Sequence, residues 1–238
     1  MKNTKVYLMS TENVKDPRTF ASWKEFLPKE RWEKTVRPLK EEDRKTELAA
    51  WFLLYQALRE WGISEEKINA DGAYYYGEHG KPMRRNEEVC FNLSHSGKYV
   101  LCAVSEMEIG CDIEKIKEVK WKLAKRFFSE KEYEFLEEIE KQESPARWAE
   151  TNETFTRFWV LRESYVKKTG EGLGVALTGL DFSDISGQKN SKGKKNGEFL
   201  EETFFEMEYD GYRIAICGEK DSKPEFVVYR GTIDNCFL

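Results

Sequence analysis

Two stretches of this chain resemble each other, and this internal similarity constrains the fold more than any other feature. Residues 91–103, FNLSHSGKYVLCA, and residues 205–217, FEMEYDGYRIAIC, each show the pattern of a strand, a turn with glycine at the same offset, and an apolar strand. An aromatic-rich helical pattern precedes each one, WFLLYQALRE in the first half and FWVLRESYVK in the second. The similarity predicts a duplication joined near residues 105–108, although two unrelated amphipathic hairpins would also produce it.

The sequence therefore predicts an α/β (α+β) fold, a pseudo-twofold duplication of two similar α/β halves at residues 1–106 and 107–238. We expect each half to be a small antiparallel sheet packed on a long helix. Helical periodicity covers residues 43–62 and 155–170. Three β-like runs, EVCFNLS, KYVLCAV and EIGCDIE, follow one another closely and predict one antiparallel sheet.

Two polar segments of the second half also carry structural information. Ser129 and Glu132 have the spacing of a capping box, which predicts a new helix after Ser129. Residues 187–197, GQKNSKGKKNG, contain no apolar side chain and predict a mobile loop. Its basic charge is also compatible with a nucleic-acid arm, but a solvated loop explains so short a segment more simply.

The composition indicates a folded and heavily charged protein. The 238 residues include 35% charged side chains, a formal net charge of −5, and 7 Trp, 11 Tyr and 15 Phe, which supply a sizeable core. No apolar run reaches the ~20 residues of a membrane span, and the first residues lack the apolar segment of a signal peptide. We therefore expect a soluble, cytoplasmic protein. Five widely spaced cysteines without a CxxC pair indicate neither a disulfide framework nor a zinc site.

Histidine is scarce, and this excludes several classes of enzyme. His79 and His95 are the two histidines of the chain, so histidine-rich metal sites and HExxH chemistry are excluded. Neither lies near a GxSxG elbow, and the chain contains no GxxxxGK[ST] or GxGxxG loop. Phosphate binding must then depend on scattered Lys and Arg side chains together with a metal ion held by carboxylates.

The segment GCDIE contains a pair of carboxylates that suits such a metal. Asp112 and Glu114 are two residues apart, so on a strand both point to one face, about 7 Å apart, with Ile113 buried opposite. Hard oxygen ligands in this arrangement suit Mg²⁺. The alternative is an ordinary solvent-facing strand edge, which the apolar flanking residues disfavour.

Two further groups of residues can take part in chemistry. Glu163 and Lys167 are four residues apart on a mostly apolar helix, where an acid and a base indicate function more strongly than on a polar one. A simple helix salt bridge is the alternative. His95 lies in Ser94-His95-Ser96-Gly97, at a predicted turn where hydroxyls, backbone N–H groups and an imidazole could bind an anion; a structural histidine is the alternative.

Taken together, these motifs resemble a known enzyme family. FNLSHSG, GCDIE, RFFSEKEY and FWVLRESYVKKTGEGL are similar, in this order, to motifs of the 4′-phosphopantetheinyl transferases, specifically the large surfactin-type class. The resemblance implies a pair of α/β halves with the active site at their interface. It also implies transfer of phosphopantetheine from coenzyme A to a serine hydroxyl of a carrier protein, with release of adenosine 3′,5′-bisphosphate. The implied metal is Mg²⁺, with Mn²⁺ as a substitute.

The resemblance assigns roles to individual residues. Asp112, Glu114 and Glu163 match the family's metal-binding carboxylates, and Glu163 is also the expected base for the serine. Lys167 matches the lysine that neutralises the diphosphate. The residues expected to bind coenzyme A are Arg31 and Lys34 at the 3′-phosphate, Arg44, Ser94 and His95 in the phosphate-binding segment, Gly80, Lys81 and Pro82 at the adenosine end, and Lys167. Glu132 matches an acidic residue whose role in the family is less certain.

The chain departs from the family pattern at two positions. Arg162 stands where lysine is usual, and Thr46 stands where an arginine is expected, so Arg44 or Lys45 would have to replace that arginine. These departures leave open a non-catalytic module that binds coenzyme A or a carrier protein. A transferase restricted to one carrier is a second alternative.

The implied partners are an acyl or peptidyl carrier protein and coenzyme A, in nonribosomal peptide, polyketide or fatty acid biosynthesis. We expect a monomer with no nucleic-acid and no membrane partner. Because carrier proteins are expected to be acidic around their serine and the net charge here is −5, recognition requires a local patch. Residues 122–128 supply three basic and two aromatic side chains, although a helix with its aromatics packed inward explains them equally well.

Overall fold

The structure is a computed structural model that describes residues 3–19, 24, 27–85, 89–172, 177, 179–184, 190–191, 193–220 and 223–230. Leu173, residues 187–189 and 192 of the predicted loop, and Cys236 lie outside the described residues. The chain forms two compact units. We call them the α2 unit, residues 3–106 with the described residues from Pro224 onward, and the α6 unit, the described residues of Met107–Lys223. Each unit is a mixture of helices and small sheets.

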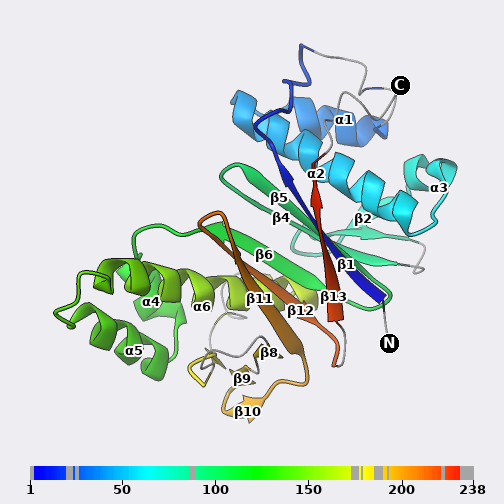
Figure 1. The fold of residues 1–238 in the computed structure, drawn as a ribbon. Helices are drawn as coiled ribbons and strands as arrows, with labels where there is room; N and C mark the ends of the chain where they lie inside the picture. Colours follow the sequence, from blue (N-terminus) through cyan, green and yellow to red (C-terminus); the bar gives the residue numbers. More distant parts are fainter. Residues whose placement is uncertain are drawn as a thin grey trace. The chain divides into compact units, whose positions relative to one another are not determined.

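The α2 unit contains a four-stranded sheet in the order β13-β1-β5-β4 and a long helix, α2, packed on it (Figure 1). Its strands are β1 (Asn3–Ser10), β4 (Cys90–Ser96), β5 (Tyr99–Ser105) and β13 (Lys223–Tyr229). A second, two-stranded sheet joins β2 (Tyr74–Tyr76) to β3 (Pro82–Arg84), and the helices are α1 (Lys29–Val36), α2 (Glu41–Glu60) and α3 (Glu65–Asn69). The long α2 is buried over much of its length because its apolar residues cover nearly two faces.

The α6 unit also contains a four-stranded sheet with a long helix packed on it. Its four-stranded sheet has the order β6-β12-β11-β8, and its long helix α6 packs on β6 and β12. The strands are β6 (Gly110–Lys115), β8 (Asn190–Ser191), β11 (Thr203–Tyr209) and β12 (Tyr212–Gly218). A small sheet of β7 (Leu180–Asp181), β9 (Lys194–Lys195) and β10 (Glu198–Phe199) and the helices α4 (Trp121–Phe127), α5 (Glu130–Glu140) and α6 (Arg147–Thr169) complete it.

The two similar stretches of sequence both form β-hairpins, but they do not align in register. β4 and β5 are joined by the two residues Gly97 and Lys98, whereas β11 and β12 are joined by Asp210 and Gly211. The glycine is therefore the first residue of one turn, with φ of 53°, and the second residue of the other, with φ of 74°. Aligning the sequences on glycine shifts the strands by one residue, so the duplication stays a prediction.

Three predictions about individual elements were wrong. The run EIGCDIE does not join the sheet of the two preceding runs, because β6 pairs with β12 in the α6 unit. Helix α6 begins at Arg147, eight residues before the predicted start, and its first turns are held by Thr151, whose hydroxyl donates to the Arg147 carbonyl and to Glu140. Within the predicted loop, the described residues 190–191 and 194–195 form β8 and β9, whose backbones pair with β11 and β7.

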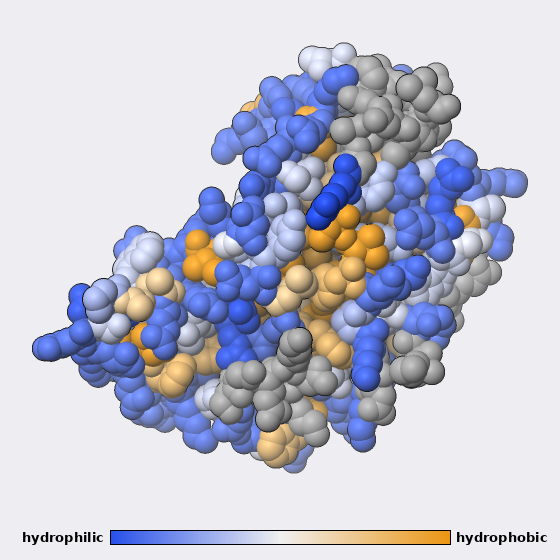
Figure 2. Space-filling model, viewed as in Figure 1, coloured by the Kyte–Doolittle hydropathy of each residue, from blue (hydrophilic) through white to orange (hydrophobic). Residues whose placement is uncertain are grey.

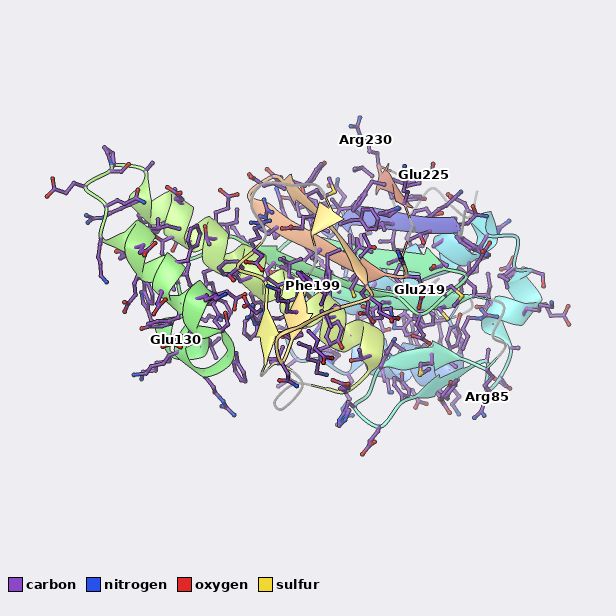
Figure 3. The ribbon with its side chains drawn as sticks, turned by 90° about the horizontal axis from the view of Figure 1, so that it is seen from below. Arg85, Glu130, Phe199, Glu219, Glu225 and Arg230 are labelled. Atoms are coloured by element: carbon purple, nitrogen blue, oxygen red, sulfur yellow. The ribbon has the colours of Figure 1, made fainter. Side chains whose placement is uncertain are left out.

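The capping box before α5 is confirmed and belongs to a larger buried network. The Ser129 hydroxyl accepts from the Glu132 backbone N–H, and the Glu132 carboxylate accepts from the Ser129 backbone N–H. Ser129 directly precedes Glu130, the first residue of the helix (Figure 3). Glu132 and Arg162 form an ion pair in which both side chains are fully buried. Arg162 also donates to the carbonyl oxygens of Phe127 at 3.2 Å, Phe158 at 3.1 Å and Leu180 at 3.0 Å. The network connects α4, α5, α6 and β7, which gives the unusual arginine a structural role.

Other expectations concern cysteines, membranes and the surface. Cys102, Cys111 and Cys217 are buried, and none of the four described cysteines takes part in a disulfide. Among the helices of the described ranges, none has both the length and the apolar character needed to cross a lipid bilayer. Most of the surface visible in Figure 2 is hydrophilic, in line with the large share of charged residues.

Candidate functional site

In the α6 unit, β6 lies against α6 at a very short distance because residue 110 is glycine. A Cβ atom at Gly110 would lie 1.9 Å from the carbonyl oxygen of Ser164 and 2.5 Å from the amide nitrogen of Lys168. Any larger residue would push the strand away from the helix backbone. The glycine of GCDIE therefore sets the position of the carboxylates that follow it.

Asp112 and Glu114 lie on the same face of β6 as Gly110, the face toward α6. The Lys167 ammonium of α6 donates to Asp112 Oδ1 at 2.6 Å. Asp112 is only 3% exposed and Ile113 on the opposite face is fully buried. The alternative of a solvent-facing Asp112 therefore does not hold, and Lys167 forms an ion pair with Asp112 of β6.

Glu163 lies one turn before Lys167 and is 8% exposed. Burial, together with the charges of Asp112 and Glu114, raises the pKa of Glu163 from 4.5 to about 7, against the opposing effect of Lys167. Burial lowers the pKa of Lys167, but the charge of Asp112, with Cys111 and Glu163, outweighs burial and raises that pKa overall. The cluster therefore contains more negative charge than one lysine neutralises.

These residues suit a divalent cation by chemistry. Carboxylate oxygens are the ligands that Mg²⁺ prefers, and an added cation would relieve the repulsion that raises the pKa of Glu163. Among the described residues, no group of three His, Cys, Asp or Glu side chains is arranged to hold a metal ion as it stands. The assignment of Asp112, Glu114 and Glu163 to a metal remains a prediction.

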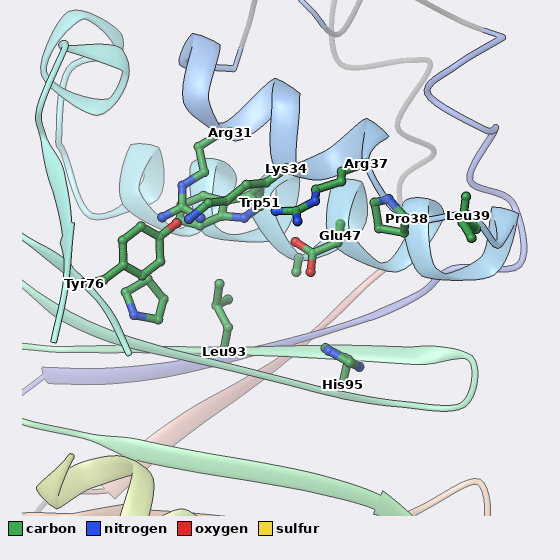
Figure 4. A pocket seen from close by; sticks show the side chains of 12 residues that line it. Arg31, Lys34, Arg37, Pro38, Leu39, Glu47, Trp51, Tyr76, Leu93 and His95 are labelled. Carbon is green, nitrogen blue, oxygen red and sulfur yellow. The ribbon is translucent and has the colours of Figure 1, made fainter. Parts of the chain in front are cut away.

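The α2 unit contains a cavity of about 600 Å³ with a cationic lining (Figure 4). Its charged side chains are Arg31, Lys34 and Arg37 from α1 and its C-terminus, and one carboxylate, Glu47 of α2. The remaining lining residues are Pro38, Leu39, Ala50, Trp51, Tyr76, Pro82, Leu93 and His95. Residues 31, 34 and 37 share one face of α1 because they are three apart. Such a cavity favours an anion that also carries an apolar or aromatic part.

Arg31 is the least exposed of these cations. Its guanidinium lies 3.7 Å from the centroid of the Trp51 ring and 4.6 Å from that of Tyr76. Lys34 Nζ lies 3.6 Å from the same Tyr76 ring (Figure 4). Within the described residues, the buried Nη2 of Arg31 has no hydrogen-bond partner, and burial lowers the pKa of Arg31. A buried guanidinium with an unused donor is suited to bind an anion.

The structure changes the interpretation of the histidine motif. Ser94, His95 and Ser96 belong to β4, and the turn comprises Gly97 and Lys98, so the predicted placement of His95 in a turn was wrong. Side chains alternate along a strand, so His95 is exposed on the cavity face with Leu93 while Ser94 is buried on the opposite face. The two side chains cannot bind one anion together.

The remaining predicted ligands fall into two groups. Gly80, Lys81 and Pro82 form the expected tight connection, in which the Gly80 amide donates to Gly77 and Gly80 has a φ of 81°. Of these three residues, Pro82 lines the cavity. Arg44 does not line it, because its guanidinium is engaged by Asp16 and by the carbonyl oxygens of Pro38 and Leu39.

A second cavity, of about 530 Å³, lies in the α6 unit. Its lining includes Phe199 and Glu219, which are labelled in Figure 3. Its lining contains two lysines and three glutamates, and Lys168 is paired with Glu202 at 3.2 Å and Glu219 at 3.6 Å. The charge of Lys168 is thus already neutralised by these two glutamates. Of the two cavities, the one in the α2 unit is suited to a phosphate group.

Sequence reasoning missed several of the cavity residues. Arg37 continues the three-residue spacing of Arg31 and Lys34, and this spacing was the available signal. Trp51 and Glu47 are one turn apart on α2, where the aromatic looked like ordinary core. Tyr76 could not have been identified, because its position depends on the pairing of β2 with β3.

Comparisons with known proteins give an independent result. Residues 108–217 match the model of the 4′-phosphopantetheinyl transferase superfamily. The matched range contains β6 and α6, and so includes Asp112, Glu114, Glu163 and Lys167.

Individual relatives extend the similarity over most of the chain. It is 29% identical over 208 residues to the 4′-phosphopantetheinyl transferase Sfp of Bacillus subtilis (strain 168), covering 84% of this chain and 85% of that protein. It is 31% identical over 207 residues to the 4′-phosphopantetheinyl transferase ffp of Bacillus subtilis, with the same coverage. The 4′-phosphopantetheinyl transferase HetI of Nostoc sp. (strain PCC 7120 / SAG 25.82 / UTEX 2576) is 35% identical over 130 residues, or 49% of this chain and 50% of that protein. This chain belongs to the 4′-phosphopantetheinyl transferase family, in its Sfp-like branch.

Proposed function

We propose that this enzyme transfers the 4′-phosphopantetheine group of coenzyme A to a serine hydroxyl of an apo acyl or peptidyl carrier protein, in a reaction that depends on Mg²⁺ and releases adenosine 3′,5′-bisphosphate. The observation that carries the proposal is the surplus of negative charge around Glu163, whose pKa is raised to about 7 by burial and by Asp112 and Glu114. Such a cluster suits both a divalent cation and a proton acceptor near neutral pH.

The cavity of the α2 unit supports coenzyme A as the donor. Three cations, Arg31, Lys34 and Arg37, suit the 3′-phosphate, while Trp51 and Tyr76 supply aromatic surface suited to the adenosine. His95 at the cavity face of β4 adds a hydrogen-bonding group beside the same ligand.

In the proposed reaction the serine oxygen forms a bond to the β-phosphorus of the coenzyme A diphosphate, and the bond from this phosphorus to the bridging oxygen breaks. The electron pair leaves with adenosine 3′,5′-bisphosphate, and Glu163 accepts the serine proton. Lys167 stabilises negative charge on the diphosphate, and Asp112 orients the Lys167 ammonium through their hydrogen bond. Asp112, Glu114 and Glu163 would hold Mg²⁺, which when bound neutralises the nonbridging oxygens of the diphosphate.

The carrier protein is proposed to contact the exposed basic face of α4. Lys122, Lys125 and Arg126 are exposed, whereas Phe127 and Phe128 are partly buried against the core of the α6 unit. The aromatics thus pack inward, and the surface offered to an acidic partner is basic and not apolar.

The proposal is tested by mass spectrometry of several apo-carrier proteins mixed with this enzyme, coenzyme A and Mg²⁺. The expected result is a mass gain of ~340 Da on the carrier, abolished by EDTA, as metal-assisted transfer requires. The variant Arg31→Leu should reduce coenzyme A affinity in calorimetry, whereas Arg59→Leu, at the far end of α2, should not. Binding of coenzyme A without transfer to any carrier would contradict the proposal and support the binding module. Transfer to a single carrier would identify the restricted enzyme.

A further inference from the structure

The connection between α1 and α2 is held by two arginines that donate to its backbone. Arg18 donates to the carbonyl oxygen of Val36 at 2.9 and 2.6 Å, to that of Arg37 at 3.4 Å and to that of Pro38 at 3.1 Å. Arg44 donates to the carbonyl oxygens of Pro38 at 2.9 Å and Leu39 at 2.7 Å. Each of the four successive carbonyl groups from residue 36 to residue 39 therefore accepts from a guanidinium.

Asp16 connects the two arginines through hydrogen bonds. Its Oδ1 accepts from the Arg44 Nε at 2.8 Å and from the Arg18 backbone N–H at 3.0 Å, and its Oδ2 forms an ion pair with Arg44. The Arg44 and Asp16 side chains are 7% and 11% exposed. We call Asp16, Arg18 and Arg44 the arginine clamp. A partly buried, bidentate pair of this kind is geometrically specific.

The clamped segment forms one wall of the cavity. Arg37, Pro38 and Leu39 all line it (Figure 4). Leu39 is 91% exposed and Arg37 is also exposed, so side-chain packing does little to fix this segment. Because packing is weak here, the position of the Arg37 guanidinium depends on the hydrogen bonds that hold its backbone.

We propose that Asp16 and Arg44, with Arg18, are positioning residues for coenzyme A, which fix the wall that carries Arg37 without touching the ligand. This inference rests on the proposed function, because it takes the cavity to bind the 3′-phosphate. It replaces the expectation that Arg44 contacts the coenzyme. The Arg44 donors bond to Asp16 and to the backbone carbonyl oxygens of Pro38 and Leu39, two residues of the cavity wall, and Arg44 itself does not line the cavity.

The test is a double-mutant cycle measured by calorimetric binding of coenzyme A to the full chain. A lysine ammonium cannot make the same set of hydrogen bonds as the planar Arg44 guanidinium. Arg44→Lys should therefore weaken coenzyme A binding about tenfold, the size expected when one charge-assisted hydrogen bond is misplaced. In an Arg37→Gln background, Arg44→Lys should change coenzyme A affinity by less than about twofold, because the Arg37 guanidinium that Arg44 positions is no longer present. The kcat at saturating coenzyme A should stay unchanged, with the effect confined to KM.

Two variants and one further measurement keep the result interpretable. Arg18→Lys, at an exposed position, should show the same dependence on Arg37, and Arg59→Lys, the same change at the other end of α2, should have no effect. Circular dichroism shows whether each variant folds. Hydrogen exchange of residues 36–40 in the ligand-free protein should be faster in Arg44→Lys than in the parent.

The outcomes separate the two claims. An equal loss of affinity in both backgrounds would mean that Arg44 does not act through Arg37, and this would overturn the clamp. Unchanged exchange of residues 36–40 would overturn it as well, whatever the ligand does. A third outcome is that the parent protein fails to bind coenzyme A while hydrogen exchange of residues 36–40 is still faster in Arg44→Lys. This outcome would contradict the proposed function but would support the role of the arginine clamp in fixing this segment.

Discussion

Replacing Glu163 by glutamine should make the metal-free protein more stable at alkaline pH, although the residue is proposed to act in the reaction. Glu163 is 8% exposed and lies among the charges of Asp112 and Glu114. Burial and these charges raise the pKa of Glu163 from 4.5 to about 7. A carboxyl group with a raised pKa in the folded state binds its proton more tightly there than in the unfolded chain. Its contribution to stability is fully present below pH 4.5 and is lost as pH rises through 7.

The magnitude follows from the two pKa values. A shift of one pKa unit corresponds to about 1.4 kcal/mol, so the full cost of ionising Glu163 in the folded protein is about 3 kcal/mol. Between pH 5 and pH 8 the unfolding free energy of the parent should fall by about 2–3 kcal/mol through this group alone. Glutamine cannot ionise, so the stability advantage of Glu163→Gln over the parent should grow by that amount over the same interval.

The assay is urea denaturation followed by far-UV circular dichroism at pH 5 and pH 8, with EDTA present. Glu150→Gln is the matched control, because Glu150 is exposed in the first turn of the same helix. Its stability difference from the parent should be the same at both pH values. Adding Mg²⁺ at pH 8 should stabilise the parent and have little effect on Glu163→Gln. A stability difference between Glu163→Gln and the parent that does not change with pH would refute the reasoning.

Three further predictions follow from the packing. Glu132→Gln should lower the unfolding free energy by about 3–5 kcal/mol in urea denaturation, because it leaves a buried guanidinium without its counter-ion, whereas Glu130→Gln at the exposed start of the same helix should change it by less than about 1 kcal/mol. Gly110→Ala should cost at least about 3 kcal/mol or prevent folding, detected as lost soluble protein, since its Cβ would meet the α6 backbone. Tyr76→Leu should weaken coenzyme A binding about three- to tenfold in calorimetry through loss of its contacts with two cavity cations, and an equal effect of Tyr75→Leu would contradict this.

Much of the fold followed from local patterns in the sequence. The apolar periodicity of α2 and α6 and the alternation in β4 and β5 are properties of neighbouring residues, and the capping box at Ser129 depends on four consecutive positions. The failure at β6 was of another kind. Membership of β6 in the sheet of β12 depends on pairing over about a hundred residues, which no local pattern encodes.

The same distinction applies to the candidate site. Spacing placed Asp112 and Glu114 on one face of a strand, and this holds because a strand has a period of two. The placement of His95 was wrong because the four-residue motif suggested a turn, while strand pairing continues through Ser96 and the hairpin turn is formed by Gly97 and Lys98. Arg44 was expected only as a substitute for the family arginine that aligns with Thr46, and its side chain is held by Asp16, a partner that sequence spacing could not indicate.

Arg162 shows how a departure from a family pattern can be compatible with an intact site. Successive residues of a helix lie about 100° apart, so Arg162 and Glu163 point in different directions from α6. Arg162 is fully buried; it donates to the Phe158 carbonyl within α6 and links the helix to the carbonyl groups of Phe127 and Leu180 and to Glu132. The charges of Asp112 and Glu114 on β6 help to raise the pKa of Glu163. A lysine has three donors on one nitrogen and could not reach all four acceptors, so arginine fixes the rotation of the helix more firmly. Because that rotation determines where the Glu163 carboxylate lies, the substitution that first suggested a lost activity is compatible with the role proposed for Glu163.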